Sequence, residues 1–141
     1  MLHMERIEMK IEEVEGIGPA FAEKLSSVGI VTTDDLLARG GKKSERVAIA
    51  IETGINEGML LEWANHVDLM RIKGVGSEFS DMLEAAGVDS PAELAQRNAK
   101  NLAETMGELD MARNTTRRIP TESMVAGWIE EAKTMERAVE H

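Results

Sequence analysis

A two-glycine corner, EGIGPAFAEKL at residues 15–25, decides the fold of this chain. It recurs 58 residues later as KGVGSEFSDML at residues 73–83. In both copies an apolar residue separates the glycines, and a phenylalanine and a leucine follow at the same spacing. Glycine adopts positive φ without steric cost and lets another chain segment approach closely. We therefore expect a tight turn at each corner, with positive φ at Gly18 as well as at Gly16.

The repeat extends well beyond the corner. At the same offset the chain repeats a glycine, a leucine and an arginine, in the pairs Gly29 and Gly87, Leu36 and Leu94, and Arg39 and Arg97. Each half also contains one tryptophan, Trp63 or Trp128. Self-similarity at a fixed period indicates one structural unit built twice. We predict a first repeat over residues 1–70 and a second over residues 71–141, packed on the first as a single globule.

Apolar residues recur with helical spacing inside each repeat. Phe21, Leu25 and Val28 lie on one face of a helix. Pro19 suits the first helical position, because its missing N–H would be unpaired there in any case. Gly29 is placed to end that helix with positive φ. No segment shows the alternation of a strand, so the sequence predicts an all-α protein.

Composition narrows the class of protein. Aromatic residues are only 3% of the chain, so aliphatic residues and the ten methionines must fill the core, and we expect Trp63 and Trp128 to be largely buried within it. The absence of cysteine excludes disulfides and thiolate zinc sites. No stretch approaches the roughly 20 apolar residues of a membrane span, and the N-terminus lacks the apolar core of a signal peptide. We expect a cytoplasmic protein without a membrane partner.

The charge balance weighs against nucleic acid. The formal net charge is −10, and an acidic protein is repelled by phosphate at long range. Two segments are locally basic, and their cations are Arg39, Lys42, Lys43 and Arg46 in RGGKKSER and Arg113, Arg117 and Arg118 in ARNTTRR. A phosphate track would require one of these clusters beside the first corner, and the alternative is that they are ordinary solvated surface. We take the first cluster as the supporting one.

The corners and the segments around them resemble the helix-hairpin-helix family. The stretches that carry the resemblance are EGIGPAFAEKL, TTDDLLARG at residues 32–40, the segment over residues 53–88 that contains the second corner, and ELAQRN at residues 93–98. More closely, the chain is similar to an uncharacterised family of tandem helix-hairpin-helix proteins, a domain of unknown function. The resemblance implies tandem SAM-like repeats in one compact helical domain. It also implies weak binding of duplex DNA or another nucleic acid without sequence preference.

In such proteins the turn amides contact phosphate and a basic residue after the second glycine assists. The resemblance thus gives candidate residues for anion binding, which are Gly16, Ile17, Gly18, Ala20 and Lys24 in the first corner and Lys73, Gly74, Val75 and Gly76 in the second. Ala20 stands where a base is usual, whereas Glu78 in the first turn of the second helix competes with phosphate for the helix dipole. We therefore expect the first corner to dominate.

Two functions remain open from sequence. One is a non-enzymatic module that contacts nucleic-acid backbone weakly, and the other is a protein–protein interaction or scaffold domain that has lost the basic surface. The sequence contains no catalytic, phosphate-loop or dinucleotide motif and implies no cofactor. Glu62 and His66 share a helix face at i, i+4, but one histidine without further ligands does not predict a metal site.

Overall fold

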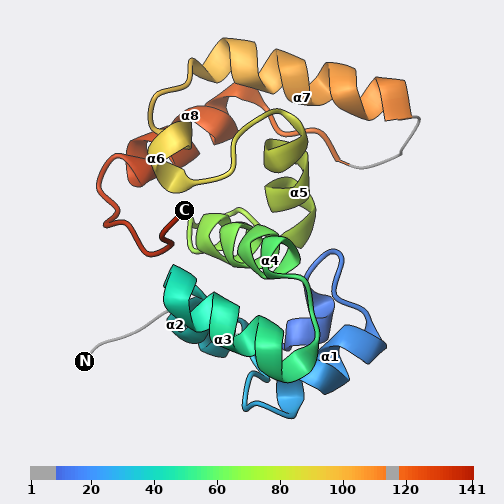
Figure 1. The fold of residues 1–141 in the computed structure, drawn as a ribbon. Coiled ribbons are helices and arrows are strands. Elements are labelled where there is room, and N and C mark those ends of the chain that lie inside the picture. Colours follow the sequence, from blue (N-terminus) through green and yellow to red (C-terminus); the bar gives the residue numbers. More distant parts are fainter. Residues whose placement is uncertain (1–8, 114–117) are drawn as a thin grey trace. The chain divides into compact units, whose positions relative to one another are not determined.

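The computed structural model describes residues 9–113 and 118–141, and the regular structure in these segments is helical (Figure 1). One isolated antiparallel bridge, between Lys10 and Thr32, is the only β pairing there. The all-α prediction is therefore confirmed. In chain order the elements are η1 (Ile11–Glu13), α1 (Pro19–Ser26), α2 (Thr33–Gly40), α3 (Lys43–Thr53), α4 (Glu57–Met70), α5 (Ser77–Ala85), α6 (Pro91–Leu94), α7 (Ala99–Arg113) and α8 (Glu122–Ala132).

The chain divides into two units. Unit 1 contains the described residues up to Val67 together with Ala138–His141, and unit 2 is Asp68–Arg137. The boundary falls within α4, close to the expected division after residue 70. The last four residues were expected in the second repeat, but the structure places them in unit 1. The packing of both repeats as a single globule stays a prediction.

Unit 1 has its own apolar core. Its fully buried side chains include Leu25 of α1, Leu36 of α2, Ile49 of α3 and Leu60 of α4. Helix α1 packs against η1, and α2 packs against α3. The segment before η1 pairs with the start of α2, because the amide of Thr33 donates to the carbonyl of Met9 over 2.9 Å.

Unit 2 is built around a second apolar core. Leu83 of α5, Leu94 of α6, Met106 of α7 and Val125 of α8 are fully buried in it. Helix α7 packs against α5 and α8, and α6 packs against α8. The helical stripes of the second repeat thus meet one another, as their periodicity predicts.

Both tryptophans lie in equivalent surroundings. Trp63 is 2% exposed and Trp128 is 4% exposed, so the predicted burial of both is confirmed. The Phe21 and Trp63 ring centroids are 5.1 Å apart, and the Phe79 and Trp128 centroids are also 5.1 Å apart. The phenylalanine that follows each corner therefore packs edge-on or tilted against the tryptophan of its own unit, an arrangement that aromatic quadrupoles favour.

An arginine that recurs in both repeats binds the C-terminal end of the helix that follows each corner. Arg39 donates to the carbonyl oxygen of Val28 over 2.8 Å, beyond the end of α1. Arg97 makes the equivalent bond to the carbonyl of Ala86 over 3.4 Å, beyond the end of α5. The glycine that follows has positive φ in both units, as predicted for a helix stop.

Candidate functional site

Each corner is an exposed turn anchored by one buried side chain. Ile17 is 2% exposed, and its amide donates to the carbonyl of Val14 over 3.0 Å. Val75 is 4% exposed and makes the same bond to Ile72 over 3.0 Å. The glycines on either side of these two residues are exposed, and so is Ala20. The apolar residue turns inward and leaves the glycine backbone at the surface.

The two glycines of a corner are not equivalent. Gly16 has φ +90° and Gly74 has φ +91°, and a Cβ at either would lie within 3.3 Å of a tryptophan indole nitrogen. Gly18 has φ −90° and Gly76 has φ −94°, with nothing near the position of an added Cβ. The expectation of positive φ at Gly18 is therefore wrong, because this residue is already the extended N-cap of α1.

The start of α1 presents backbone donors to solvent. The first helical hydrogen bond runs from the amide of Ala22 to the carbonyl of Gly18 over 2.9 Å, and the amides that precede it in the first turn have no helical acceptor. In the second corner the matching bond runs from Ser80 to Gly76, also over 2.9 Å. Such helix ends carry partial positive charge and suit an anion such as phosphate.

The supporting basic cluster does not form around the first corner. Arg46 has no exposed surface, and its guanidinium bonds to the carbonyls of Gly40 and Gly41 and to the carboxylate of Glu57. The prediction that Arg46 belongs to a surface cluster of cations is thus wrong. A charged group is buried only when its donors are satisfied, and here they are.

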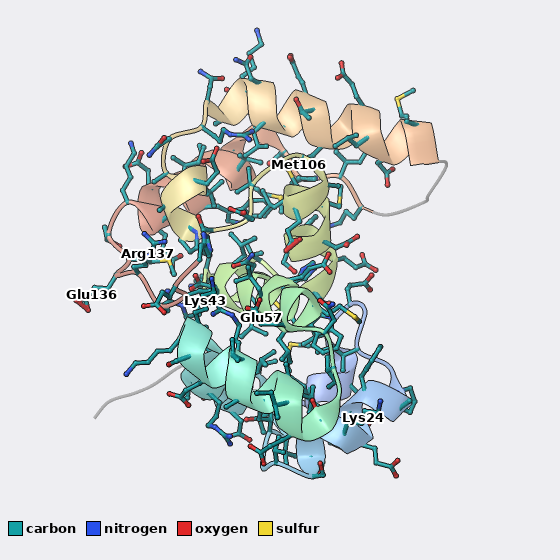
Figure 2. All side chains as sticks on the ribbon, in the orientation of Figure 1. Lys24, Lys43, Glu57, Met106, Glu136 and Arg137 are labelled. Carbon is teal, nitrogen blue, oxygen red and sulfur yellow. The ribbon has the colours of Figure 1, made fainter. Side chains whose placement is uncertain are left out.

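The remaining cations of that cluster lie elsewhere in unit 1. Arg39 reaches the C-terminal end of α1, whereas the corner lies at the N-terminal end, and an eight-residue helix is about 12 Å long. Lys42 and Lys43 open α3. Lys24 lies in the last turn of α1, apart from Lys43 (Figure 2). Within α1, Lys24 is the one cation available to the first corner.

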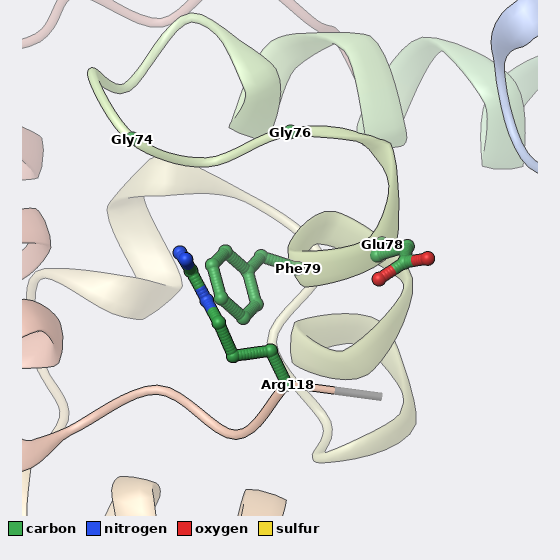
Figure 3. Close-up of a pocket in the computed structure, with 5 residues that line it drawn as sticks. All are labelled: Gly74, Gly76, Glu78, Phe79 and Arg118. Atoms are coloured by element: carbon green, nitrogen blue, oxygen red, sulfur yellow. The ribbon is translucent and has the colours of Figure 1, made fainter. Parts of the chain in front are cut away.

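The second corner has a neighbouring guanidinium. Gly74, Gly76, Glu78, Phe79 and Arg118 line a pocket in unit 2 (Figure 3). The Cζ atom of Arg118 lies 5.4 Å from the Phe79 ring centroid, a cation–π contact. Figure 3 shows the carboxylate of Glu78 pointing away from the Arg118 side of the ring. Glu78 itself lines this pocket, and the competition expected from its carboxylate at the start of α5 stays a prediction.

A carboxylate also lies near the second corner. The amide of Lys73 donates to Oε1 of Glu131 over 3.1 Å, and this bond ties the start of the turn to α8. The side chain of Lys73 itself is exposed. In the described part of the chain this corner thus has two cations nearby, Lys73 and Arg118, and two acids, Glu78 and Glu131.

Arg118 lies in the basic segment ARNTTRR, which the sequence does not place beside either corner. In the structure its guanidinium lies against Phe79, at the second corner. The only available signal was local basicity, which does not say where a loop returns. The other members of that cluster, Arg113 and Arg117, lie at and beyond the limit of the described side chains.

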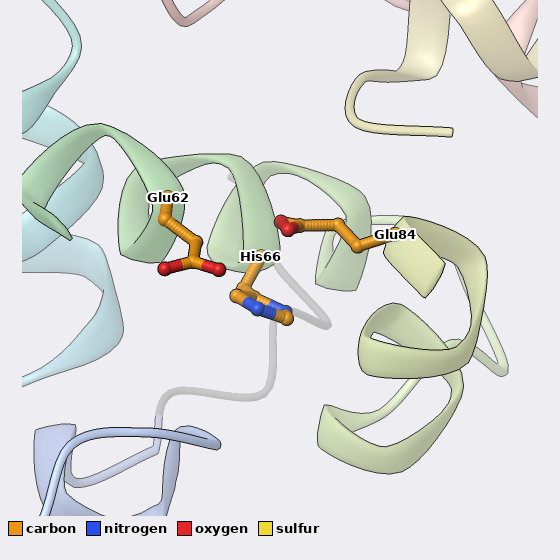
Figure 4. Close-up of side chains that lie close together, drawn as sticks. All are labelled: Glu62, His66 and Glu84. Atoms are coloured by element: carbon orange, nitrogen blue, oxygen red, sulfur yellow. The ribbon is translucent and has the colours of Figure 1, made fainter. Parts of the chain in front are cut away.

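Glu62 and His66 lie on successive turns of α4, as their spacing predicts (Figure 4). His66 is 4% exposed, whereas Glu62 is exposed. Glu84, also drawn in Figure 4, belongs to α5 of unit 2. Within unit 1, Glu62 and His66 supply two side chains, fewer than the three or four protein ligands of zinc sites.

The described residues define an all-α protein of two units, and each unit has its own glycine corner and its own phenylalanine–tryptophan pair. A family model described as a domain of unknown function, DUF4332, matches residues 15–135, and the chain belongs to this family. Neither the curated proteins nor the solved structures give a match to this chain. Among the helices of the described segments, none has the length and apolar character needed to cross a membrane.

Proposed function

We propose that this chain is a non-enzymatic helix-hairpin-helix module that contacts the phosphate backbone of nucleic acid through its glycine corners. Both corners place exposed glycines at the start of a helix, and both bury the apolar residue between the glycines. Backbone amides at a helix start recognise phosphate regardless of the base, which supports binding without sequence preference.

The observation that carries the proposal is Arg118 beside the second corner. A guanidinium held against Phe79 beside the exposed glycines adds a charge-assisted donor to the corner amides, a combination that suits a phosphate oxygen. We therefore give the second corner the stronger role, in place of the first. In the first corner two acids, Glu13 and Glu15, precede Gly16, and Lys24 lies more than a turn away.

The binding is weak on this proposal. With a net charge of −10 the protein is repelled by the duplex at long range, and the corners must overcome that repulsion locally. We expect an affinity in the range of about 10⁻⁴–10⁻⁶ M that falls steeply with salt, as for other contacts made mainly to phosphate.

The test is fluorescence anisotropy with a labelled DNA duplex at about 50 and 200 mM salt. Arg118→Ala should weaken binding and lower the salt slope by about one unit, since one phosphate contact is lost. Lys100→Ala is the matched control, because it removes the same charge from an exposed position at the opposite end of α7. Its effect should be smaller, and Arg118→Lys should keep part of the binding.

The first corner is tested separately by Ala20→Lys. This change adds a cation to an exposed position in the first turn of α1 and should steepen the salt slope by about one unit. The proposal is contradicted if the unmodified chain does not bind at about 50 mM salt and Ala20→Lys gains nothing. Equal losses in Arg118→Ala and Lys100→Ala would remove the second corner from it.

A protein–protein interaction domain is the alternative function. Helix α3 exposes Val47 by 42% and Ile51 by 79%, one turn apart on the same face. Exposed apolar side chains grouped on one face are typical of interaction surfaces. Sedimentation equilibrium of the chain and of Ile51→Glu would detect self-association through α3. On this alternative Ile51→Glu dissociates the complex, whereas Arg118→Ala leaves it intact.

A further inference from the structure

Residues Ala138–His141, which we call the tail, lie outside any helix, and unit 1 holds them by main-chain bonds. The amide of Glu140 donates to the carbonyl of Gly41 over 2.7 Å, and the carbonyl of Glu140 accepts from Nη2 of Arg46. The side chain takes part as well, since Oε1 of Glu140 accepts from the amide of Lys43 over 2.9 Å. Glu140 thus hydrogen-bonds to the rest of unit 1 through its amide, its carbonyl and its carboxylate.

The receiving surface is positioned by groups other than the tail. We name it the tail groove and define it by Gly41, Lys43, Arg46 and Asn65. Arg46 is completely buried, and its Nη1 donates to the carbonyl of Gly40 over 2.7 Å while Nε donates to Glu57 over 3.0 Å. These bonds fix the guanidinium and direct Nη2 to the tail, so the groove is preorganised for an acceptor.

Three further features define what fits the groove. Gly41 has φ −71°, which any residue adopts, but a Cβ there would lie 2.5 Å from the carbonyl oxygen of Ala138. The groove therefore needs a glycine for close approach of the bound backbone. Val139 is 2% exposed, and Nε2 of His141 lies 3.0 Å from Oδ1 of Asn65.

The carboxylate of Glu140 also completes α3. Lys42, the N-cap of α3, has no side-chain cap, and the amide of Lys43 at the first helical position would otherwise lack a protein acceptor. A carboxylate at this end of a helix is favoured by the helix dipole. Glutamate is thus selected by both charge and position.

We propose that the tail groove is a peptide-binding site for extended segments in which an apolar residue precedes a glutamate, and that the tail is its occupant in cis. Main-chain bonds that hold the backbone, with one apolar side chain and one carboxylate for specificity, are the elements of extended-peptide recognition. The residues just before the tail, 135–137, lie outside any helix, so the tail leaves the groove without unwinding one. The proposal is independent of nucleic-acid binding.

A peptide in solution must compete with the attached tail. A segment joined by a short flexible connection has an effective concentration of about 1 mM or more at its own site. The unmodified chain should therefore bind an added peptide poorly. A full-length chain with a weakened tail should bind it well.

The experiment titrates a fluorescent peptide of sequence ERAVEH, residues 136–141, with the full chain and with Val139→Ser/Glu140→Ala. The double variant should bind the peptide about tenfold or more tightly than the unmodified chain, because its own tail competes less. The peptide ERAVQH should bind more weakly than ERAVEH. Adding Gly41→Ala to the double variant should abolish binding by closing the groove.

Circular dichroism decides how each result is read. A folded double variant that does not bind ERAVEH, or binds it no more tightly than the unmodified chain, overturns the proposal. If the double variant loses helix, ERAVEH should restore the helical signal and raise the melting temperature with increasing dose. Failure of ERAVEH to do so, or equal rescue by ERAVQH, overturns the proposal as well.

Discussion

Gly16 and Gly18 are separated by one isoleucine, yet the backbone at Gly16 disfavours any side chain, whereas the backbone at Gly18 accepts one. Gly16 has φ +90°, which strains any other residue, and the Trp63 indole lies beside it. Gly18 is extended and caps α1 without a side-chain bond. Gly16→Ser should lower the free energy of unfolding by about 1–3 kcal/mol, the usual cost of a strained backbone.

Gly18→Ser is the matched control. Serine is a favoured N-cap and restricts the unfolded chain, so this variant should be as stable as the original or more stable, by about 0.4–1 kcal/mol. Urea unfolding followed by circular dichroism measures both changes. Equal destabilisation by the two variants would contradict the different roles of the two glycines.

Trp63 joins the first corner to the core of unit 1. Its indole packs on Phe21, with centroids 5.1 Å apart, and lies beside Gly16. Trp63→Ala should lower the free energy of unfolding by about 3–5 kcal/mol, as other large-to-small core changes do. Thermal unfolding followed by circular dichroism tests this. Trp63→Phe should lose less, and an unchanged midpoint for Trp63→Ala would show that the indole is not part of the core.

The arginines show why side-chain roles are harder to predict than helices. Local sequence grouped Arg39 and Arg46 as surface cations, because a basic run is usually solvated. The guanidinium of Arg46 is held by several main-chain and side-chain acceptors, and one of them, the carbonyl of Glu140, is 94 residues away, which no local pattern contains. Arg39 did carry a usable signal, since Arg97 repeats it at the same offset of 58 residues as the glycine corners.

At the scale of elements, α2 begins with a reciprocal capping box. Oγ1 of Thr32 accepts from the amide of Asp35 over 3.1 Å, and Oδ2 of Asp35 accepts from the amides of Val31 and Thr32 over 3.0 and 3.1 Å. The bonds from Val31 and then from Thr32 hold the pKa of Asp35 below its ordinary value of 3.8. The ionised carboxylate is therefore favoured in the folded state.

A lowered pKa in the folded state makes stability depend on pH. The contribution of Asp35 is complete well above pH 3.8 and is lost as the pH falls through the lower folded value. Asp35→Asn should thus reduce the melting temperature at pH 7, and the gap should close in acid. Melting curves between pH 7 and 2.5 test it, with Glu23→Gln, an exposed acid of α1, as the control. A gap that does not narrow in acid would contradict the role of the charge.

The helices were predictable where apolar spacing and a stop signal agreed. Pro19 marks the start of α1, and Gly29 follows its end with φ +86°, as the sequence indicated. The tail was not predicted, because four residues carry no periodicity and their partners are remote. Which corner has a guanidinium beside it depends on how the chain returns after α7, which only the packed unit determines.

For the whole molecule, the net charge of −10 sets the response to salt. Excess negative charge destabilises a compact state by self-repulsion, and salt screens that repulsion. Raising sodium chloride from about 10 to 200 mM should therefore increase the melting temperature, measured by circular dichroism. Glu104→Gln/Glu108→Gln, at two exposed acids of α7, should show a smaller increase. A melting temperature that falls with salt would contradict the prediction.

The position of the tail in the sequence determines when unit 1 can be completed during synthesis. A ribosome synthesises unit 1 as far as Val67, then all of unit 2, and only afterwards the residues that fill the tail groove. The acceptor for the amide of Lys43 is 97 residues downstream of it. Since nascent domains fold from the N-terminus as they emerge, the helices of unit 1 appear first but acquire their last partner after unit 2 has been made.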